Sequence, residues 1–441
     1  MVTLALLLAL ALPPASRAQS ATPATPPPST PAPAAVADHG MAPGGTNECL
    51  VCHRKEKEKR LSEPTLHFLD DVHYRKGLGC IACHGGDPKD NDITGMDPDK
   101  GFMGKPKHSE IAALCAKCHT NAAYMKRFNP QPYIFSMAEF QTSVHFKKAA
   151  QGDTKVATCT SCHGVHGIRT HKDPASPVYH TNVPHTCAQC HNPDYMKGRS
   201  IPTDQYTKYK DSVHGKAVLE KGDMSAPACN NCHGNHGAVP PNTSDISRVC
   251  SNCHGREGEL FEGSKVKETL ALEGKRGCVT CHGNHGVMKP TDAMIGLDPV
   301  TGGVCGSCHV KGSAGQVAAE QFVPAFHALK ARISEADSVL RRAERLGMPT
   351  EKGQELLRQA GDQVVSLRST LHGFDFTQDS ASVTEGRSAA DKALDFAKKA
   401  LVDWKTRRVG MGLSLIAILF AIGLLLLKIR QVEEDSRGAV K

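Results

Sequence analysis

The apolar positions follow a helical period most clearly in the C-terminal third of the chain. From Phe322 to Ala343 they recur at spacings of four and three residues, which predicts one face of an amphipathic helix. Gly347-Met-Pro349 interrupts the pattern, and Thr350 stands where it can cap a second helix. The predicted face of the first helix consists of Phe322, Phe326, Leu329, Ile333, Ala336, Leu340 and Ala343.

Two more helices with the same period follow. The third is expected to begin at about Ser382. Short connections predict an antiparallel three-helix bundle over 316–408, and the Gly-Met-Pro turn disfavours a single extended coiled coil. The apolar positions of these two helices are Leu357, Ala360, Val364, Leu367 and Leu371, then Ala390, Leu394, Ala397, Leu401 and Trp404.

An apolar stretch without charge, Val409–Leu427, follows the third helix. About 20 apolar residues suffice to cross a bilayer, so we expect a transmembrane helix over 409–427 and a cytoplasmic tail over 428–441. Basic residues flank the stretch on both sides and do not orient it. The bundle would then be a stalk, with the 347–350 turn toward the membrane and a third helix of roughly 42 Å.

The N-terminus has an apolar run from Val2 to Leu12, followed by Ser16-Arg17-Ala18. This pattern predicts a signal peptide over 1–18, although no basic residue precedes the run. Residues 19–46 are rich in Pro, Ala and Thr, and we expect them to form a disordered linker.

The segment 47–312 shows no sustained period. We expect short helices, such as Ser136–Gly152 and Gln205–Lys221, with loops between them and no sheet. Only 5% of the residues are aromatic, so side chains alone would make a poor core for this segment. The overall fold class predicted is mostly α with extensive irregular loops.

One signature, C-x-x-C-H, occurs nine times in this segment and uses all 18 cysteines. It is the attachment signature of c-type haem, in which two thioethers hold the porphyrin and the histidine is the proximal iron ligand. Zinc sites or disulfides would not require a histidine after every second cysteine. The cysteine pairs, each with its histidine, are Cys49, Cys52 and His53; Cys80, Cys83 and His84; Cys115, Cys118 and His119; Cys159, Cys162 and His163; Cys187, Cys190 and His191; Cys229, Cys232 and His233; Cys250, Cys253 and His254; Cys278, Cys281 and His282; Cys305, Cys308 and His309.

The chain therefore predicts nine covalent haems c, arranged as one single motif and four doublets. Nine haems add about 18 propionate charges, offset by about nine positive charges when every iron is ferric, so the formal charge of +8 does not indicate binding to nucleic acid. The porphyrins would also supply the buried surface that the side chains lack, and without them this segment should not fold.

Fourteen of the 23 histidines lie outside the motifs, and nine distal ligands are needed if every iron is capped by two imidazoles. Three motifs extend to C-x-x-C-H-G-x-H-G, and Ser-Val-His precedes two doublets. In the fourth doublet Ser264-Lys-Val-Lys stands in place of that triplet, which leaves one ligand open. The expected distal set is His67, His73, His108, His145, His166, His214, His236, His285 and His327, with His372 as a substitute for His327 at the same end of the bundle.

These doublets, with their Ser-Val-His triplets, resemble the class III multihaem cytochromes c of anaerobic respiration, especially membrane-tethered relatives in metal-reducing bacteria. The stretch from Asp173-Pro-Ala-Ser-Pro-Val178 to Thr186-Cys187 resembles the same group. The resemblance covers roughly 46–430. It implies bis-histidine haems in close contact that form an electron wire.

The expected function is electron transfer at the periplasmic face of the inner membrane. The donor would be an inner-membrane quinol-oxidising complex or a periplasmic protein, and the acceptor another cytochrome or a terminal reductase. Such a carrier is not an enzyme. One alternative is a multihaem nitrite reductase or hydroxylamine oxidoreductase, which needs an open iron; no C-x-x-C-Lys occurs, but the haem at His53 or at His309 could provide one. Another alternative is a relay subunit of a larger respiratory complex.

Overall fold

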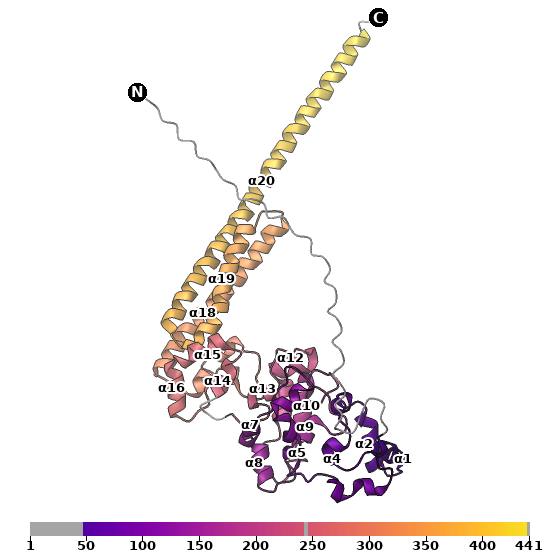
Figure 1. The fold of residues 1–441 in the computed structure, drawn as a ribbon. Coiled ribbons are helices and arrows are strands. Elements are labelled where there is room, and N and C mark those ends of the chain that lie inside the picture. Colours follow the sequence, from indigo (N-terminus) through magenta and orange to yellow (C-terminus); the bar gives the residue numbers. More distant parts are fainter. Residues whose placement is uncertain (1–46, 242–245, 439–441) are drawn as a thin grey trace, which may run out of the picture. The chain divides into compact units, whose positions relative to one another are not determined.

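The computed structural model describes residues 47–241 and 246–438, and over these ranges the regular elements are helices, without a strand (Figure 1). The predicted signal peptide and linker, 1–46, lie outside the described residues. The chain forms two compact units. One contains residues up to Leu69 together with His73–Lys105, and the other contains Asp70–Val72 together with the chain from Pro106 onward. The division falls inside the segment 47–312, and the bundle belongs to the same unit as seven of the motifs.

The first unit holds two motifs on short helices. Asn47 caps the first helix through its side chain, which accepts a hydrogen bond from the Leu50 amide at 3.3 Å. The elements up to residue 105 are α1 Glu48–Lys55, α2 Lys59–Phe68, α3 Val72–Arg75 (whose first residue belongs to the second unit), α4 Ile81–His84, η1 Ile93–Met96 and η2 Pro98–Lys100.

The second unit begins with a series of short helices that carry the other seven motifs. They are α5 Ile111–His119, α6 Ala122–Lys126, α7 Met137–Thr142, α8 Val144–Ala150, α9 Cys159–His163, η3 His180–Asn182, α10 Val183–Ala188, α11 Gln205–Asp211, α12 Val213–Lys221, α13 Cys229–His233, α14 Ile246–Ser251, α15 Gly255–Glu262, α16 Lys265–Leu272, α17 Gly277–His282, η4 Asp292–Ile295, η5 Pro299–Thr301 and η6 Cys305–Ser307.

Two of the predicted helices are each broken in two. Ser143 separates α7 from α8, and Ser212 separates α11 from α12. Both serines take extended backbone angles, and their hydroxyls cap the second helix of each pair. The predictions of continuous helices over Ser136–Gly152 and Gln205–Lys221 were therefore wrong, because a Ser-Val-His triplet begins a helix and does not lie inside one.

The three-helix bundle is present as predicted. It consists of α18 Ala314–Arg345, α19 Glu351–Thr370 and α20 Phe376–Gly438, with η7 Leu371–Gly373 between the last two. The predicted faces form its core: Phe322, Phe326 and Leu329 are at most 2% exposed and cluster with Leu367. Thr350 occupies the capping position of α19, but its side chain makes no capping hydrogen bond.

The third helix differs from the prediction at both ends. It begins at Phe376 and not at Ser382, and it continues without a break through the apolar stretch to Gly438. The far end of the bundle packs around Ala343, Met348 and Ala400, so the turn at 347–350 lies near the point where α20 leaves the bundle.

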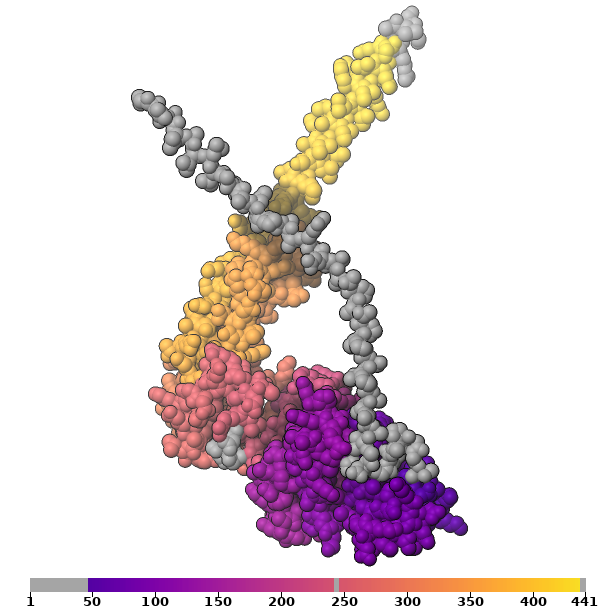
Figure 2. All heavy atoms as spheres, viewed as in Figure 1, coloured from indigo at the N-terminus to yellow at the C-terminus, as the bar shows by residue number. Residues whose placement is uncertain are grey.

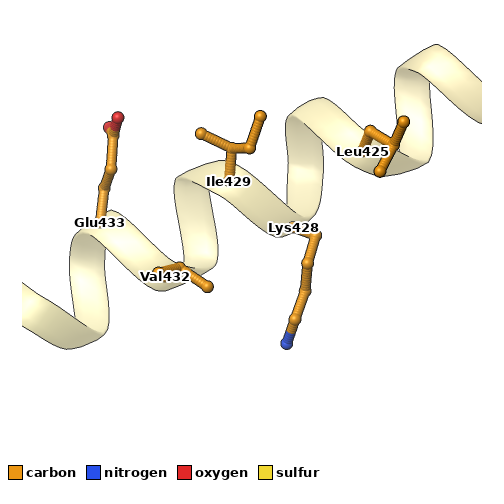
Figure 3. A pocket seen from close by; sticks show the side chains of 5 residues that line it. All are labelled: Leu425, Lys428, Ile429, Val432 and Glu433. Atoms are coloured by element: carbon orange, nitrogen blue, oxygen red, sulfur yellow. The ribbon is translucent and has the colours of Figure 1, made fainter.

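Beyond the bundle, α20 is a single helix without packing partners in the described chain (Figure 2). Its apolar window has a mean hydropathy of 2.6 and is long and apolar enough to cross a membrane. Figure 3 shows Leu425, Ile429 and Val432, together with Lys428 and Glu433, projecting from this helix alone. The shallow hollow that they line is therefore the surface of an isolated helix and not a ligand cavity.

Candidate haem sites

The second unit contains the same structural repeat three times. Each repeat begins with a serine-capped helix and continues with two C-x-x-C-H motifs; the repeats span 143–191, 212–254 and 264–309. The capping serines are buried, and their hydroxyls accept a hydrogen bond from an amide in the first turn at 2.9 to 3.2 Å. This cap fixes the start of each helix and therefore the direction of the side chain at its second position. The three serines are Ser143, Ser212 and Ser264.

Backbone hydrogen bonds join one repeat to the next. The Val144 amide donates to the Ala238 carbonyl at 3.1 Å, and the Val213 amide donates to the Val287 carbonyl at 2.9 Å. Each acceptor lies two residues after the second histidine of a C-x-x-C-H-G-x-H-G extension. The capped helix of one repeat is thus bound to the extension of the following repeat, as expected for stacked repeats.

The glycine after the proximal histidine makes the extension possible. Gly164, Gly234 and Gly283 have φ angles between +74° and +84°, which side chains with a Cβ rarely adopt. Each glycine ends its motif helix. After Gly234 and Gly283 the chain turns back toward the previous repeat, so that the second histidines, His236 and His285, face His163 and His233.

Five pairs of imidazole rings face each other in the second unit, at centroid separations of 5.9 to 6.3 Å. Two imidazoles that bind opposite faces of one metal ion through bonds of about 2 Å have ring centres about 6 Å apart. The residues present therefore fit a bis-histidine haem at these five motifs. The pairs, with the motif histidine first, are His191 with His145, His163 with His236, His254 with His214, His233 with His285, and His282 with His372.

The pairs fall into two classes that follow the repeat. At the first motif of each repeat the two rings are nearly parallel, with interplanar angles of 10° to 18°. At the second motif of the first two repeats the rings are crossed, at 61° and 45°. The first motif receives its partner from the next repeat, whereas the second motif receives it from the capped helix of its own repeat.

His372, from the bundle, faces the first motif of the third repeat. Its angle of 18° with His282 belongs to the parallel class, so η7 stands where a further repeat would place its extension. The Nδ1 atom of His372 lies 3.1 Å from the Ser369 carbonyl oxygen, and a proton donated there leaves Nε2 for a metal. Ser369 in turn donates to Glu257 of α15 at 2.6 Å, which anchors the end of α19 beside the motifs.

Burial keeps these imidazoles in the form that binds metal. Desolvation lowers the pKa of His145, His214 and His236, and also that of His285. Desolvation and then the facing ring lower the pKa of His282. Only a neutral imidazole can bind iron, so the sites favour ligation at neutral pH.

The cysteines of consecutive motifs lie next to each other. Between consecutive motif doublets the contact joins first cysteines: a hydrogen bond from Cys115 lowers the pKa of Cys159 to about 7, and the pairs Cys187 with Cys229 and Cys250 with Cys278 are hydrogen-bonded in the same way. Within each repeat the second cysteine of one motif approaches the next motif; these neighbours are Cys162 with Cys187 and Cys190, Cys232 with Cys253, and Cys281 with Cys305 and Cys308. In the first unit Cys49 and Cys80 are hydrogen-bonded.

The other predicted distal ligands stand as follows. His67 is exposed on α2, and His73 lies on α3. The Nε2 atom of His108 lies 2.8 Å from the Val156 carbonyl oxygen, and His166 has a φ of +55°. His327 is exposed on α18 beside Phe326, so the structure brings the substitute His372 to a motif histidine and not His327. The prediction for the first four of these residues stays a prediction.

Known proteins resemble parts of this chain. A family model described as cytochrome c554 and c-prime matches residues 186–283, which hold four of the motifs. The C-type polyheme cytochrome OmcC of Geobacter sulfurreducens is 27% identical over 29% of this chain and 15% of its own length. The multiheme cytochrome MtrA of Shewanella baltica is 26% identical over 36% of this chain and 48% of its own.

The C-type polyheme cytochrome OmcB of Geobacter sulfurreducens is 23% identical over 37% of this chain and 27% of its own length. The chain thus spans no more than about half the length of these relatives. The family model covers four of the C-x-x-C-H motifs and the facing pair of His254 with His214. Together with the relatives, these features identify the chain as a multihaem cytochrome of the c type.

Proposed function

We propose that this chain is a membrane-anchored electron carrier with one c-type haem at each of its nine motifs. Haem iron would supply the one-electron redox chemistry, while the chain supplies ligands, spacing and surroundings. The observation that carries the proposal is the succession of neighbouring cysteines from Cys115 to Cys305, in which each motif of the second unit adjoins the next one in sequence.

This succession bears on electron transfer because each cysteine sulfur would be bonded to the edge of its porphyrin. Neighbouring sulfurs therefore bring neighbouring porphyrin edges together. In the order of the sequence, seven motifs form one path through the second unit with no motif bypassed. A path without a gap suits a relay better than a set of independent redox sites.

The imidazole pairs support the same function. An iron with two imidazole ligands can change its charge without exchanging a ligand, so it transfers electrons and offers no position to a substrate. We propose His145, His214, His236, His285 and His372 as distal ligands of the second unit. His67, His73, His108 and His166 remain proposed ligands for the first three motifs, those of His53, His84 and His119, without an assigned partner.

The apolar part of α20 would anchor the chain in the inner membrane as a single span over 409–427. Its exposure and hydropathy support this role, and Trp404, with Arg408 5.0 Å above its ring, lies where interfacial residues are common. The motifs would face the periplasm, because c-type haem is attached outside the cytoplasmic membrane. The end of the chain, 428–441, would lie in the cytoplasm.

The length of α20 limits the choice of electron donor. From Phe376, beside the His282–His372 pair, to Val409 the helix rises roughly 50 Å, at 1.5 Å per residue. The last sites of the relay are thus far from a quinol inside the bilayer. The donor is expected to be a protein that protrudes from the membrane or a periplasmic cytochrome, and the acceptor another cytochrome or a terminal reductase.

Film voltammetry of the full chain in lipid nanodiscs tests the proposal. We expect reversible signals that integrate to nine electrons, a mass increase of nine haems, and no added current when nitrite or hydroxylamine is supplied. A catalytic current with either compound would contradict the carrier function. A count below nine in protein from a host competent in haem attachment would contradict the proposal of one haem at each motif.

A further inference from the structure

The second helical position after the capping serine carries a different residue in the third repeat. It is His145 in the first repeat and His214 in the second, and both face the proximal histidine of the second motif in their own repeat. In the third repeat the same position is Val266. Ser264 is buried and caps α16 as the other two serines cap their helices, so the helix has kept its place while the ligand is absent.

The third repeat also keeps the arrangement of its two motifs. Cys281 adjoins Cys305 and Cys308 just as Cys162 adjoins the cysteines of its following motif. The spacing along the chain agrees: 46 and 40 residues separate the facing histidines of the first two repeats, and 43 residues separate Val266 from His309. The repeat therefore places Val266 opposite His309.

Two side chains are candidates to replace the missing imidazole, and both lie in the wrong place. The ring of His309 lies against Gly315 at the start of α18, since a Cβ on that glycine would be 2.2 Å from the ring. His327 is twelve residues farther along α18, a rise of about 18 Å, whereas a facing imidazole needs about 6 Å. Lys275 lies 3.4 Å from the Cys308 sulfur and is paired with Glu273, which places its amine at the porphyrin edge and not over its face.

We propose that the ninth motif forms an open haem site, at which His309 binds the iron on one face and Val266 leaves the other face to a small uncharged diatomic ligand such as CO or NO. This inference rests on the haem attachment of the proposed function. A valine side chain offers neither a charge nor a proton donor, so the site suits an uncharged ligand better than an oxyanion that must be protonated during its reduction. The open site lies at the end of the relay.

The test compares two opposite substitutions in the full chain. Val266→His supplies the missing imidazole, and His145→Val copies the third repeat into the first. We expect low-temperature EPR of the oxidised wild-type protein to show a high-spin signal, which loses one haem equivalent in Val266→His and gains one in His145→Val. A high-spin signal that Val266→His leaves unchanged in a folded protein with nine haems would overturn the proposal, and so would a wild-type protein without any high-spin haem.

Titration of the reduced wild-type protein with CO gives a second readout that does not depend on how well a variant folds. We expect CO to bind, with one equivalent lost in Val266→His; wild-type protein that binds no CO overturns the proposal. Because the difference between the two proteins is measured, the site at His53 does not affect the result. Haem content, measured by mass, distinguishes failure of the open site from failure of the nine-haem relay. Nine haems without CO binding refute the open site alone. The absence of haem from Cys305 and Cys308 refutes both the open site and the nine-haem relay.

Discussion

Replacing His372 by alanine tests whether the bundle supplies an iron ligand. His372 lies 6.0 Å from His282, ring centre to ring centre, at the angle found for the other first motifs. Without it, the iron proposed at the eighth motif would keep only its proximal ligand. We expect one low-spin haem to become high-spin, so that a protein with one high-spin haem acquires a second.

The structure also sets the expected loss of stability. His372→Ala removes the hydrogen bond from Nδ1 to the Ser369 carbonyl, which is worth about 1 kcal/mol, in addition to the bond to iron. The core of the bundle does not include His372, since it is built from residues such as Phe326, Leu329 and Leu367. The loss should therefore be confined to the junction of η7 with α15, while the remainder of the bundle stays folded.

EPR of the oxidised protein measures the spin change, and amide hydrogen exchange measures the local loss of stability at the junction. His327→Ala is the matched control, because His327 is an exposed histidine of the same bundle and should alter neither measurement. His372→Met should restore a low-spin iron but raise its reduction potential, as methionine ligation does in other cytochromes c. If His372→Ala keeps every haem of the wild type in its original spin state, the assignment of His372 is wrong.

Three further predictions concern the capping serines, the buried acid of the bundle and the ring angles. Ser212→Ala should cost about 1 kcal/mol and disturb the spin state of one haem, because the serine cap positions His214. Ser264→Ala should cost a similar amount of free energy, measured by denaturation, but change no spin state. Burial raises the pKa of Asp379, whose carboxylate accepts a hydrogen bond from Thr370 at 2.7 Å. The stability that protonated Asp379 contributes is thus complete below the unfolded pKa and is lost as the pH rises through the folded pKa. Asp379→Asn should therefore raise the melting temperature at neutral pH and make the melting temperature depend less on pH. The crossed rings at His191 and His254 should give low-spin EPR signals of larger anisotropy than the parallel rings, and His145→Val should abolish one of the larger-anisotropy signals and none of the others.

The bundle could be predicted from sequence because its information is local. Apolar side chains three and four residues apart must share a face of a helix, and burial of Phe322, Leu329 and Leu367 follows once three such faces meet. The sequence between the bundle and the apolar stretch carried no signal for where the third helix ends. No glycine or proline stands between Ser382 and Val409 except Gly386, so nothing in the chain ends the helix, and α20 continues.

The proposed distal ligands were harder to predict because each facing pair joins histidines that are far apart in sequence. The C-x-x-C-H-G-x-H-G extension suggested His236 and His285, but not that each serves a motif of the preceding repeat. His372 stands 90 residues from His282, in a single 3-10 turn without a repeated motif around it. The end of the array of repeats was a usable signal. No repeat follows the last one to supply a facing histidine to its first motif, so another segment must supply that histidine.

The source of the facing histidine differs between the two motifs of a repeat, and Val266 therefore differs in origin from His372. In the proposed assignment, the first motif of a repeat takes its distal ligand from the next repeat, and His282 in the last repeat has no next repeat. The bundle would supply that ligand through His372, as capping elements complete the ends of other repeat proteins. The second motif depends on the capped helix of its own repeat, which the third repeat still has. The valine is therefore no consequence of where the array stops. Val266 stands inside an intact repeat, at the position that in our proposal decides whether the iron at the ninth motif stays open, and this is the reason to test that site first.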